Sequence, residues 1–479
     1  MKPLLCAACA FIAAIGLSAA AIAAPKNETP LTFTARSGET VEAFDGAFMV
    51  PENYDDPDSR KLTLHYIRFP ATTSKPGAPI VYLAGGPGGS GIWMAQNFRF
   101  PLFMALREFG DVIALDQRGT GASNDIEACT SSLPVDDMAP PSDEEFFAQQ
   151  REALRECIGQ WSAKGVDLKG YTTLQSVNDL EELRRHLGAR KLSLWGISYG
   201  THLALAALKE MNAHIDRVIL ASAEGLDQTI KYPARTDEYF GRLQAAIDTQ
   251  DDAKARYPDI KEMMRRVHAS LEGYPVTLSL PQRDGGSAQM LFTRRDMQRL
   301  ASAMIADPNR FARQLIEIYA AIDEGDTAPL AAVVFRFYQP NSPITFEAMP
   351  VMMDIASGVS PARRALVEEQ AKTALLGPFL NDTLYLLDAA PEYQLGDDFR
   401  KSPYSKRPVL LLTGTLDGRT YIESQKEAVA GLSKTQFVTV RNAGHNLFMV
   451  SPEVTETIKD FMRGENVDGR EIVIDLPTF

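Results

Sequence analysis

Three side chains of this sequence could together carry out nucleophilic catalysis. Ser198 lies in the pentapeptide GISYG, and Asp417 and His445 follow it later in the chain. A serine hydroxyl is a weak nucleophile, and a neighbouring histidine can take its proton and return it to the leaving group. A carboxylate bonded to that histidine fixes its tautomer and stabilises the imidazolium. The sequence therefore predicts Ser198 as nucleophile, His445 as base and Asp417 as acid of a catalytic triad.

Each of these three residues directly follows a short apolar run that we expect to form a buried strand. Six such runs occur, at residues 80–83, 112–115, 192–195, 218–220, 409–412 and 437–440. Segments with helical periodicity, such as TTLQSVNDLEELRRHLG, lie between most of them, which predicts a mostly parallel sheet with helices on both faces. Because ligands bind where the carboxyl ends of parallel strands meet, we expect Ser198, Asp417 and His445 to share one edge of this sheet.

Two glycine-rich segments predict an oxyanion hole beside Ser198. Glycines on either side of the serine suit a tight strand-to-helix turn, and the next backbone N–H, that of Tyr199, would point into the site. The segment AGGPGGSG follows the first predicted strand and offers an exposed backbone for a second donor. Since Pro87 has no N–H, we expect Gly86 to be that donor, with Gly88 as the next choice.

Other residues could take the roles of acid and base, and no metal site is expected. Asp417 precedes a glycine and could be an ordinary turn residue, while Asp116 could be the acid but precedes the nucleophile in the chain. Of the six histidines, only His445 follows a strand late in the sequence. The chain has no HExxH motif, no clustered Cys and His residues and no aspartate-rich loop, so we expect neither a metal nor a cofactor.

A mainly helical insertion is expected within this α/β architecture. The strand pattern breaks between about residues 226 and 405, where segments such as DMQRLASAMIADPNRFARQLIEIYAAIDEG have helical periodicity and no strand series is clear. The pattern resumes at RPVLLLTGTLDGRT, so the core would comprise residues 24–225 and 406–479. Residues 31–69 predict an antiparallel pair at the sheet edge, and the tail REIVIDLPTF is compatible with one short strand.

The first 23 residues have the pattern of a secretory signal peptide. Lys2 precedes an apolar run from about residue 4 to residue 17, and the sequence AIA at 21–23 offers a cleavage site before Ala24. A membrane anchor is the alternative, but the run is only weakly apolar. We therefore expect an exported protein, periplasmic or secreted, without stable membrane association once the signal is removed.

The cysteines of the remaining chain predict one disulfide. Cleavage would remove Cys6 and Cys9 and leave Cys129 and Cys157, which are 28 residues apart. Two cysteines in an exported chain favour a bridge, and two free buried thiols are the alternative.

The charge of the chain argues against two classes of partner. The 479 residues carry a formal net charge of −13 and include no long run of Lys or Arg. Nucleic acid and anionic membranes are therefore poor candidates.

The motifs, taken in order, resemble those of the proline iminopeptidase and tripeptidyl aminopeptidase family of serine peptidases. GGPGGSG, DQRGTGAS, GISYGTH, GTLDGRT and AGHNLF follow that family's order over about residues 48–463. The resemblance implies an α/β-hydrolase fold with a helical cap, an acyl-enzyme mechanism, and Ser198, Asp417 and His445 as the triad. Ala84 stands where many members have histidine, and Tyr199 stands where the iminopeptidases usually have tryptophan. Both departures favour the secreted tripeptidyl branch.

The same resemblance implies a site for the α-amino group of the substrate. The cap of that family supplies acidic residues that hold this group, and Glu224, at the start of the insertion, is the best-placed candidate. The alternatives are a solvated loop acid or a salt-bridge partner of Arg118. The expected function is an exported serine aminopeptidase that releases N-terminal residues or short peptides from peptides with a free N-terminus. A carboxylesterase using the same triad and a non-catalytic binding module are the rival functions.

Overall fold

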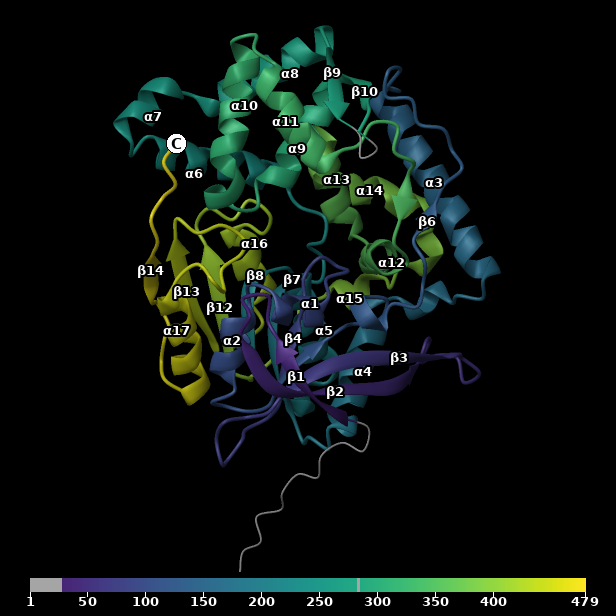
Figure 1. Cartoon of the computed structure of the whole chain (residues 1–479), viewed down its shortest axis with the longest axis vertical. Helices are drawn as coiled ribbons and strands as arrows, with labels where there is room; N and C mark the ends of the chain where they lie inside the picture. The colour runs from purple at the N-terminus through teal and green to yellow at the C-terminus, as the bar shows by residue number, and fades with distance from the viewer. Residues whose placement is uncertain (1–27, 282–284) are drawn as a thin grey trace, which may run out of the picture.

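One large sheet forms the centre of the molecule. The computed structural model describes residues 28–281 and 285–479, and within these residues ten strands form the sheet shown in Figure 1. Their spatial order is β1 (Glu28–Thr34), β2 (Thr40–Pro51), β3 (Lys61–Phe69), β5 (Val112–Leu115), β4 (Ile80–Leu83), β7 (Leu192–Ser198), β8 (Ile215–Ala223), β12 (Val409–Gly414), β13 (Thr435–Arg441) and β14 (Glu471–Val473).

The strand directions confirm the predicted mostly parallel sheet. Strands β5, β4, β7, β8, β12, β13 and β14 are parallel to their neighbours, whereas β1, β2 and β3 form an antiparallel edge that pairs with β5. All six predicted strands are present. The antiparallel edge has three strands where a pair was predicted, and the C-terminal tail adds β14.

The sheet is buried on both faces, which explains why its parallel strands read as continuous apolar runs. Val81 and Leu83 of β4 belong to a core with α4 (Thr173–His186) and α5 (Tyr199–Glu210). The alternate residues Ile80 and Tyr82 belong to a second core with α2 (Phe100–Leu106) and α17 (Pro452–Arg463). Side chains of successive strand residues point to opposite faces, so each face needs its own apolar set.

The insertion lies above the carboxyl ends of the parallel strands (Figure 1). It contains α6 (Pro233–Ile247), α7 (Asp251–Arg256), α8 (Ile260–Gly273), α9 (Arg294–Met304), α10 (Arg313–Asp323), α11 (Ala328–Phe337), α12 (Ala348–Ser357), α13 (Pro361–Ala371), α14 (Asp382–Leu386) and α15 (Asp397–Arg400). It also contains a hairpin of β9 (Val276–Pro281) and β10 (Ser287–Phe292), which the sequence analysis did not anticipate. The hairpin was missed because only every second residue of each strand is buried.

A disulfide connects two segments of the core, one of which also pairs with the insertion. Cys129 in β6 (Cys129–Thr130) is bonded to Cys157 in α3 (Asp143–Ala163), with 5.5 Å between the Cα atoms, as predicted. Strand β6 also pairs with β11 (Thr345–Phe346) of the insertion. The predicted signal peptide, with Cys6 and Cys9, lies outside the described residues. Among the described helices, none is both long and apolar enough to cross a membrane.

Candidate active site

Ser198 lies at the sharp turn between β7 and α5. Its backbone has φ +53° and ψ −128°, a conformation that side-chain-bearing residues rarely adopt. A Cβ atom at Gly196 would lie 2.6 Å from the carbonyl oxygen of Gly200, and one at Gly200 would lie 2.0 Å from that of Leu83. Strand and helix therefore approach so closely that only glycine fits on either side of the serine. The turn holds Ser198 in a strained backbone conformation at the edge of the sheet.

Asp417 and His445 are in direct contact at the same edge. The Nδ1 atom of His445 lies 3.1 Å from both carboxylate oxygens of Asp417. Asp417 is 1% exposed and also accepts hydrogen bonds from the Thr420 hydroxyl at 2.7 Å and the Arg419 backbone N–H at 2.8 Å. Burial by itself would raise the pKa of the Asp417 carboxyl, but the charge of His445 and these hydrogen bonds outweigh it and hold that pKa below its usual range. The carboxylate is thus kept ionised beside the imidazole.

Strand β8 connects Ser198 to the loop of His445. Ser198 is paired with Ala223 in the β7–β8 ladder, and the hydroxyl of the adjacent Ser222 donates to the His445 carbonyl at 2.8 Å. Because Nδ1 of His445 faces Asp417, Nε2 is the ring nitrogen left to accept a proton. The described residues show no hydrogen bond between Ser198 and His445. The structure therefore brings the acid and the base into contact after β12 and β13, and places the serine at the end of β7, with β8 between β7 and β12.

The predicted oxyanion donors lie beside Ser198. A Cβ atom on Gly85 would be 3.1 Å from the Cβ of Ser198, so the loop after β4 touches the turn. Gly86 has φ +127°, and no described group accepts a hydrogen bond from its N–H. The N–H of Tyr199 is at the first position of α5, where it has no partner within the helix. Both N–H groups are therefore available to an oxygen atom.

Glu224 is buried and already paired. Its carboxylate forms an ion pair with Lys231, which also donates to the Gln228 carbonyl at 2.8 Å. Burial would raise the pKa of Glu224, but the positive charge of Lys231 outweighs burial and lowers it. The alternative of a salt bridge to Arg118 is wrong, because Arg118 is bonded to Asp179 at 2.6 Å.

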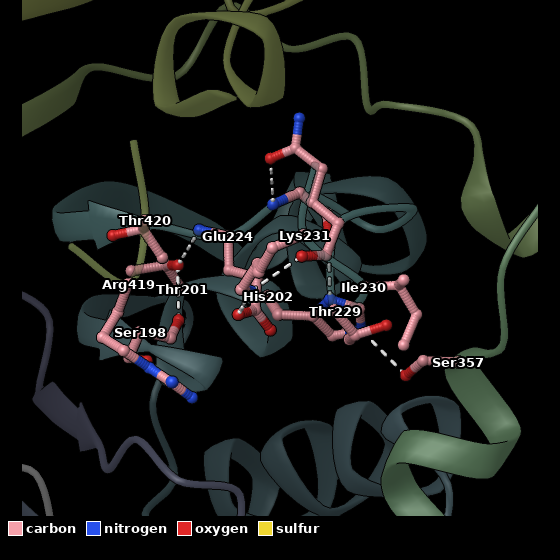
Figure 2. Close-up of polar contacts among 12 residues, drawn as sticks. Ser198, Thr201, His202, Glu224, Thr229, Ile230, Lys231, Ser357, Arg419 and Thr420 are labelled. Carbon is pink, nitrogen blue, oxygen red and sulfur yellow. Dashed lines mark hydrogen bonds and ion pairs between the residues drawn. The ribbon is translucent and has the colours of Figure 1, made fainter. Parts of the chain in front are cut away.

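Thr201 connects the Glu224 segment to the serine turn. Its hydroxyl donates to the Ser198 carbonyl at 2.6 Å and accepts the Glu224 backbone N–H at 2.8 Å. Figure 2 shows these contacts, together with the hydrogen bond between the His202 ring and the Ser357 hydroxyl of α12. The Glu224–Lys231 pair thus lies directly behind the nucleophile turn, where the core meets the insertion.

Asp354 of α12 was not among the site residues predicted from the sequence. Pro350 of this helix touches the loop after β4, 2.7 Å from where a Cβ atom of Gly88 would be, and Ser357 bonds His202 at 3.2 Å. Residues 350, 354 and 357 share one helix face, so Asp354 lies between these contacts, over the start of α5. No described group donates to its carboxylate. Burial, and then the charge of Glu224, raise the pKa of Asp354 to about 7. A lone acid within the apolar segment AMPVMMDIAS was the available signal.

Asp116, the alternative acid, has a different role. Its carboxylate accepts the Ser90 hydroxyl at 2.6 Å and the backbone N–H groups of Ile92 and Ala122 at 3.0 and 2.8 Å. These contacts tie together the two loops after β4 and β5. In the described part of the chain, no group of three or more His, Cys, Asp and Glu residues could hold a metal ion.

A cavity of about 520 Å³ adjoins the acid loop inside the insertion. Its walls are mixed: Phe292, Leu300 and Phe337 are among the apolar residues, and the charged residues are Asp296, Arg299, Asp382 and Arg419, the last of which is close to Asp417 in the chain. Such a cavity has the size and lining of a small-molecule or side-chain pocket.

The comparisons with known proteins agree with this architecture. The profile of the alpha/beta hydrolase fold family matches residues 78–452. The serine protease Hip1 of Mycobacterium tuberculosis is 32% identical over 184 residues, which are 37% of this chain and 35% of the relative. The tripeptidyl aminopeptidase of Streptomyces lividans is 28% identical over 208 residues, 40% of this chain and 38% of the relative. These matches span less than two fifths of either relative's length.

Among solved structures, Rv0554 from Mycobacterium tuberculosis aligns with a TM-score of 0.43 at 15% identity, and the alignment covers 88% of this chain and 100% of that chain. The family profile spans well over half of the sequence. The chain therefore belongs to the alpha/beta hydrolase fold family.

Proposed function

We propose that the protein is a serine hydrolase in which Ser198 is the nucleophile, His445 the base and Asp417 the acid. The observation that carries this proposal is the buried Asp417–His445 hydrogen bond beside a serine in a strained turn. A strained backbone at an exposed reactive side chain is typical of functional sites. The available N–H groups of Gly86 and Tyr199 suit the oxyanion of a tetrahedral intermediate.

The proposed reaction proceeds through an acyl-enzyme. His445 Nε2 takes the proton of Ser198 as its Oγ attacks the substrate carbonyl, and Asp417 stabilises the resulting imidazolium. The oxyanion is held by the N–H groups of Tyr199 and Gly86. His445 then protonates the leaving group, and a water molecule, deprotonated by the same histidine, releases the acyl group.

We further propose that the substrate is a peptide with a free N-terminus, so that the enzyme is an aminopeptidase. The names of the two relatives, a serine protease and a tripeptidyl aminopeptidase, support peptide substrates. Asp354 and Glu224 would together form the ammonium site. Because Lys231 neutralises Glu224, Asp354 is the acid left to bind the α-amino group directly.

Export is part of the same proposal. The N-terminal sequence pattern and the disulfide between Cys129 and Cys157 support a periplasmic or secreted protein. N-terminal sequencing of the protein recovered from the producing cell should begin at Ala24. An N-terminus that still begins at Met1 on a protein recovered from the cytoplasm would contradict export.

A substrate scan tests the enzymatic proposal. Purified protein is assayed against mono-, di- and tripeptidyl arylamides, each with a free or an acetylated amine, and against simple esters. We expect hydrolysis of the free-amine arylamides and its loss on acetylation. If only the esters are hydrolysed, the aminopeptidase proposal fails while the triad stands, and if nothing is hydrolysed both fail.

A carboxylesterase is the second candidate, and one observation favours it. The predicted ammonium site at Glu224 is already occupied by Lys231, so the region behind Ser198 is less acidic than two free carboxylates would make it. In that case substrate selection would depend on the cavity inside the insertion, whose walls are partly apolar.

A further inference from the structure

A short turn of the insertion is in direct contact with the loops that carry Asp417 and His445. This turn, residues 305–308, follows α9 and is called the cap turn below. A Cβ atom on Gly418 would be 2.2 Å from the Ile305 carbonyl oxygen, and one on Gly444 would be 2.6 Å from the Ala306 carbonyl oxygen. The backbone of the insertion therefore approaches the residues next to the acid and the base as closely as van der Waals contact allows.

Three hydrogen bonds tie the cap turn to the base loop. The His445 backbone N–H donates to the Ala306 carbonyl at 2.8 Å. The carboxylate of Asp307 accepts the Asn446 backbone N–H at 3.0 Å and its side-chain N–H at 2.5 Å. Both carboxylate oxygens of Asp307 thus accept hydrogen bonds from Asn446, the residue next to His445.

Arg99 extends this contact into the core. Its guanidinium donates to the Asn446 side-chain oxygen at 3.3 Å and lies over the ring of Phe448, 5.6 Å from the centroid. Arg99 is only 3% exposed, and burial lowers its pKa to about 10, an effect that the Asp307 carboxylate opposes. The positive charge of Arg99 therefore partly balances the negative charge of Asp307, although Asn446 lies between the two side chains and they form no direct ion pair.

The start of the base loop is held by the core. The loop begins at Asn442, whose φ of +66° lies in the left-handed region that asparagine adopts more readily than most side-chain-bearing residues. The Asn442 backbone N–H donates to the Thr415 hydroxyl at 2.9 Å and its side-chain N–H to the Ile474 carbonyl at 2.7 Å, and the Ala443 carbonyl accepts the Leu416 N–H at 2.9 Å.

His445 is bonded to Asp417 through its ring and to the Ser222 hydroxyl through its carbonyl oxygen. Directly after the base, the contacts of Asn446 come from Asp307 of the cap turn and from Arg99.

We infer that Asp307 is a positioning residue for the base. Through its hydrogen bonds to Asn446, it fixes the loop that holds His445 between Asp417 and Ser198. The inference rests on the proposed triad and adds to it that the insertion, besides covering the site, holds the base in place. A misplacement of about 1 Å in such a group can cost on the order of 100-fold in rate.

The experiment measures how fast diisopropyl fluorophosphate reacts with Ser198 in the full-length mature protein. In this reaction Ser198 Oγ displaces fluoride from phosphorus and its proton passes to His445, so the rate reports on the base without any choice of acyl substrate. The variants are Asp307→Ala, Asp307→Asn, Asn446→Ala and the double Ala variant. Asp323→Ala is the matched control, since Asp323 is another aspartate of the insertion, paired with Arg266 on the surface.

We expect Asp307→Ala to lower the labelling rate by roughly 10- to 100-fold, and to lower kcat on any active substrate with KM within about twofold. Asp307→Asn keeps an acceptor for the Asn446 backbone N–H, so it should stay within about threefold of the wild type. The effects of Asp307→Ala and Asn446→Ala should be less than additive, because both remove the hydrogen bond between the two side chains, although Asn446→Ala keeps its backbone N–H. Asp323→Ala should react like the wild type.

Several outcomes would overturn the inference. These are a normal rate for Asp307→Ala, an equal loss in Asp307→Asn, or additive losses in the double variant. If Asp307→Ala does not fold, the Asn446→Ala and Asp307→Asn variants still decide the matter.

A second readout separates this inference from the proposed function. The downfield proton signal of a histidine Nδ1–H bonded to a carboxylate reports the hydrogen bond between His445 and Asp417 and does not require Ser198. It should weaken in Asp307→Ala and persist in Ser198→Ala, and persistence in both would refute the role of Asp307. If Ser198→Ala is labelled as fast as the wild type, it is the proposed function that fails.

Discussion

At the scale of single residues, Ser198 combines reactivity with backbone strain. Its φ of +53° is unfavourable for serine and alanine but acceptable for glycine. We predict that Ser198→Ala and Ser198→Gly both lose at least about 1,000-fold in kcat. Ser198→Gly should be more stable than Ser198→Ala by about 1 kcal/mol, because only glycine relieves the strain. Urea unfolding and arylamide hydrolysis measure the two effects.

Two results would contradict this prediction. Near-normal turnover by Ser198→Ala would remove the serine from the mechanism. Equal stability of the Ala and Gly variants would mean that the turn stores no strain at this residue.

Asp354 gives the proposed ammonium site a dependence on pH. Its carboxyl has a pKa of about 7, raised by burial and by Glu224 and opposed by Lys231 and Arg419. Above pH 7 it is charged and attracts the substrate ammonium, whereas below pH 7 it is neutral. We predict that KM for free-amine substrates rises as the pH falls below about 7, and that Asp354→Asn raises it about 10-fold at pH 7.5. Steady-state kinetics across pH 5.5–8 check this.

Substrates without an amine provide the control for Asp354. Their KM should be insensitive both to Asp354→Asn and to pH in this range. A parallel rise of KM for esters would show that the residue shapes the pocket and does not bind the amine. A larger effect of Glu224→Gln than of Asp354→Asn on free-amine substrates would assign the direct contact to Glu224.

At the scale of elements, the disulfide connects α3 to the strand that the insertion pairs with. Cys129 and Cys157 are both buried, and the bridge closes a loop of 28 residues. We predict no free thiol in denatured, unreduced mature protein. Replacing both cysteines with alanine should lower the free energy of unfolding by about 3–4 kcal/mol, chiefly because the unfolded chain regains entropy. A thiol assay and denaturant unfolding measure these quantities.

Activity provides the check on the role of the bridge. The double alanine variant should keep the wild-type kcat at a temperature where it is folded, since the bridge touches none of the proposed site residues. Two titratable thiols in the mature protein would contradict the bridge itself.

At the scale of the whole molecule, the insertion has a core of its own but also shares a core with the sheet. Helices α6, α8, α9 and α10 share a core of their own, which includes Phe240, Met264 and Tyr319. Helices α12 and α14, however, contribute Met352 and Leu384 to the core that covers one face of the sheet. We predict a single calorimetric transition, with equal calorimetric and van't Hoff enthalpies. Two separate transitions would show that the insertion unfolds independently.

The sequence by itself determined the strands, the edge at which they end, and which serine, acid and histidine follow them. These features are local: a strand buried on both faces needs an apolar run, α4 needs apolar residues at helical spacing, and GISYG needs glycines where strand and helix touch. The alternating hairpin of β9 and β10 had no such continuous run and was missed.

Only the tertiary structure decided what surrounds these residues. Lys231 neutralises Glu224, and Asp354 lies over α5. The Asp307 carboxylate accepts a hydrogen bond from Asn446, which is 139 positions away in the sequence. Each of these relations depends on how the insertion folds back onto the strand ends, and on the burial and charge that result. A single sequence has periodicity along the chain but no record of which distant side chains meet. Its local pattern therefore predicted the residues of the proposed triad, but not the residues that we propose to position the base and to select the substrate.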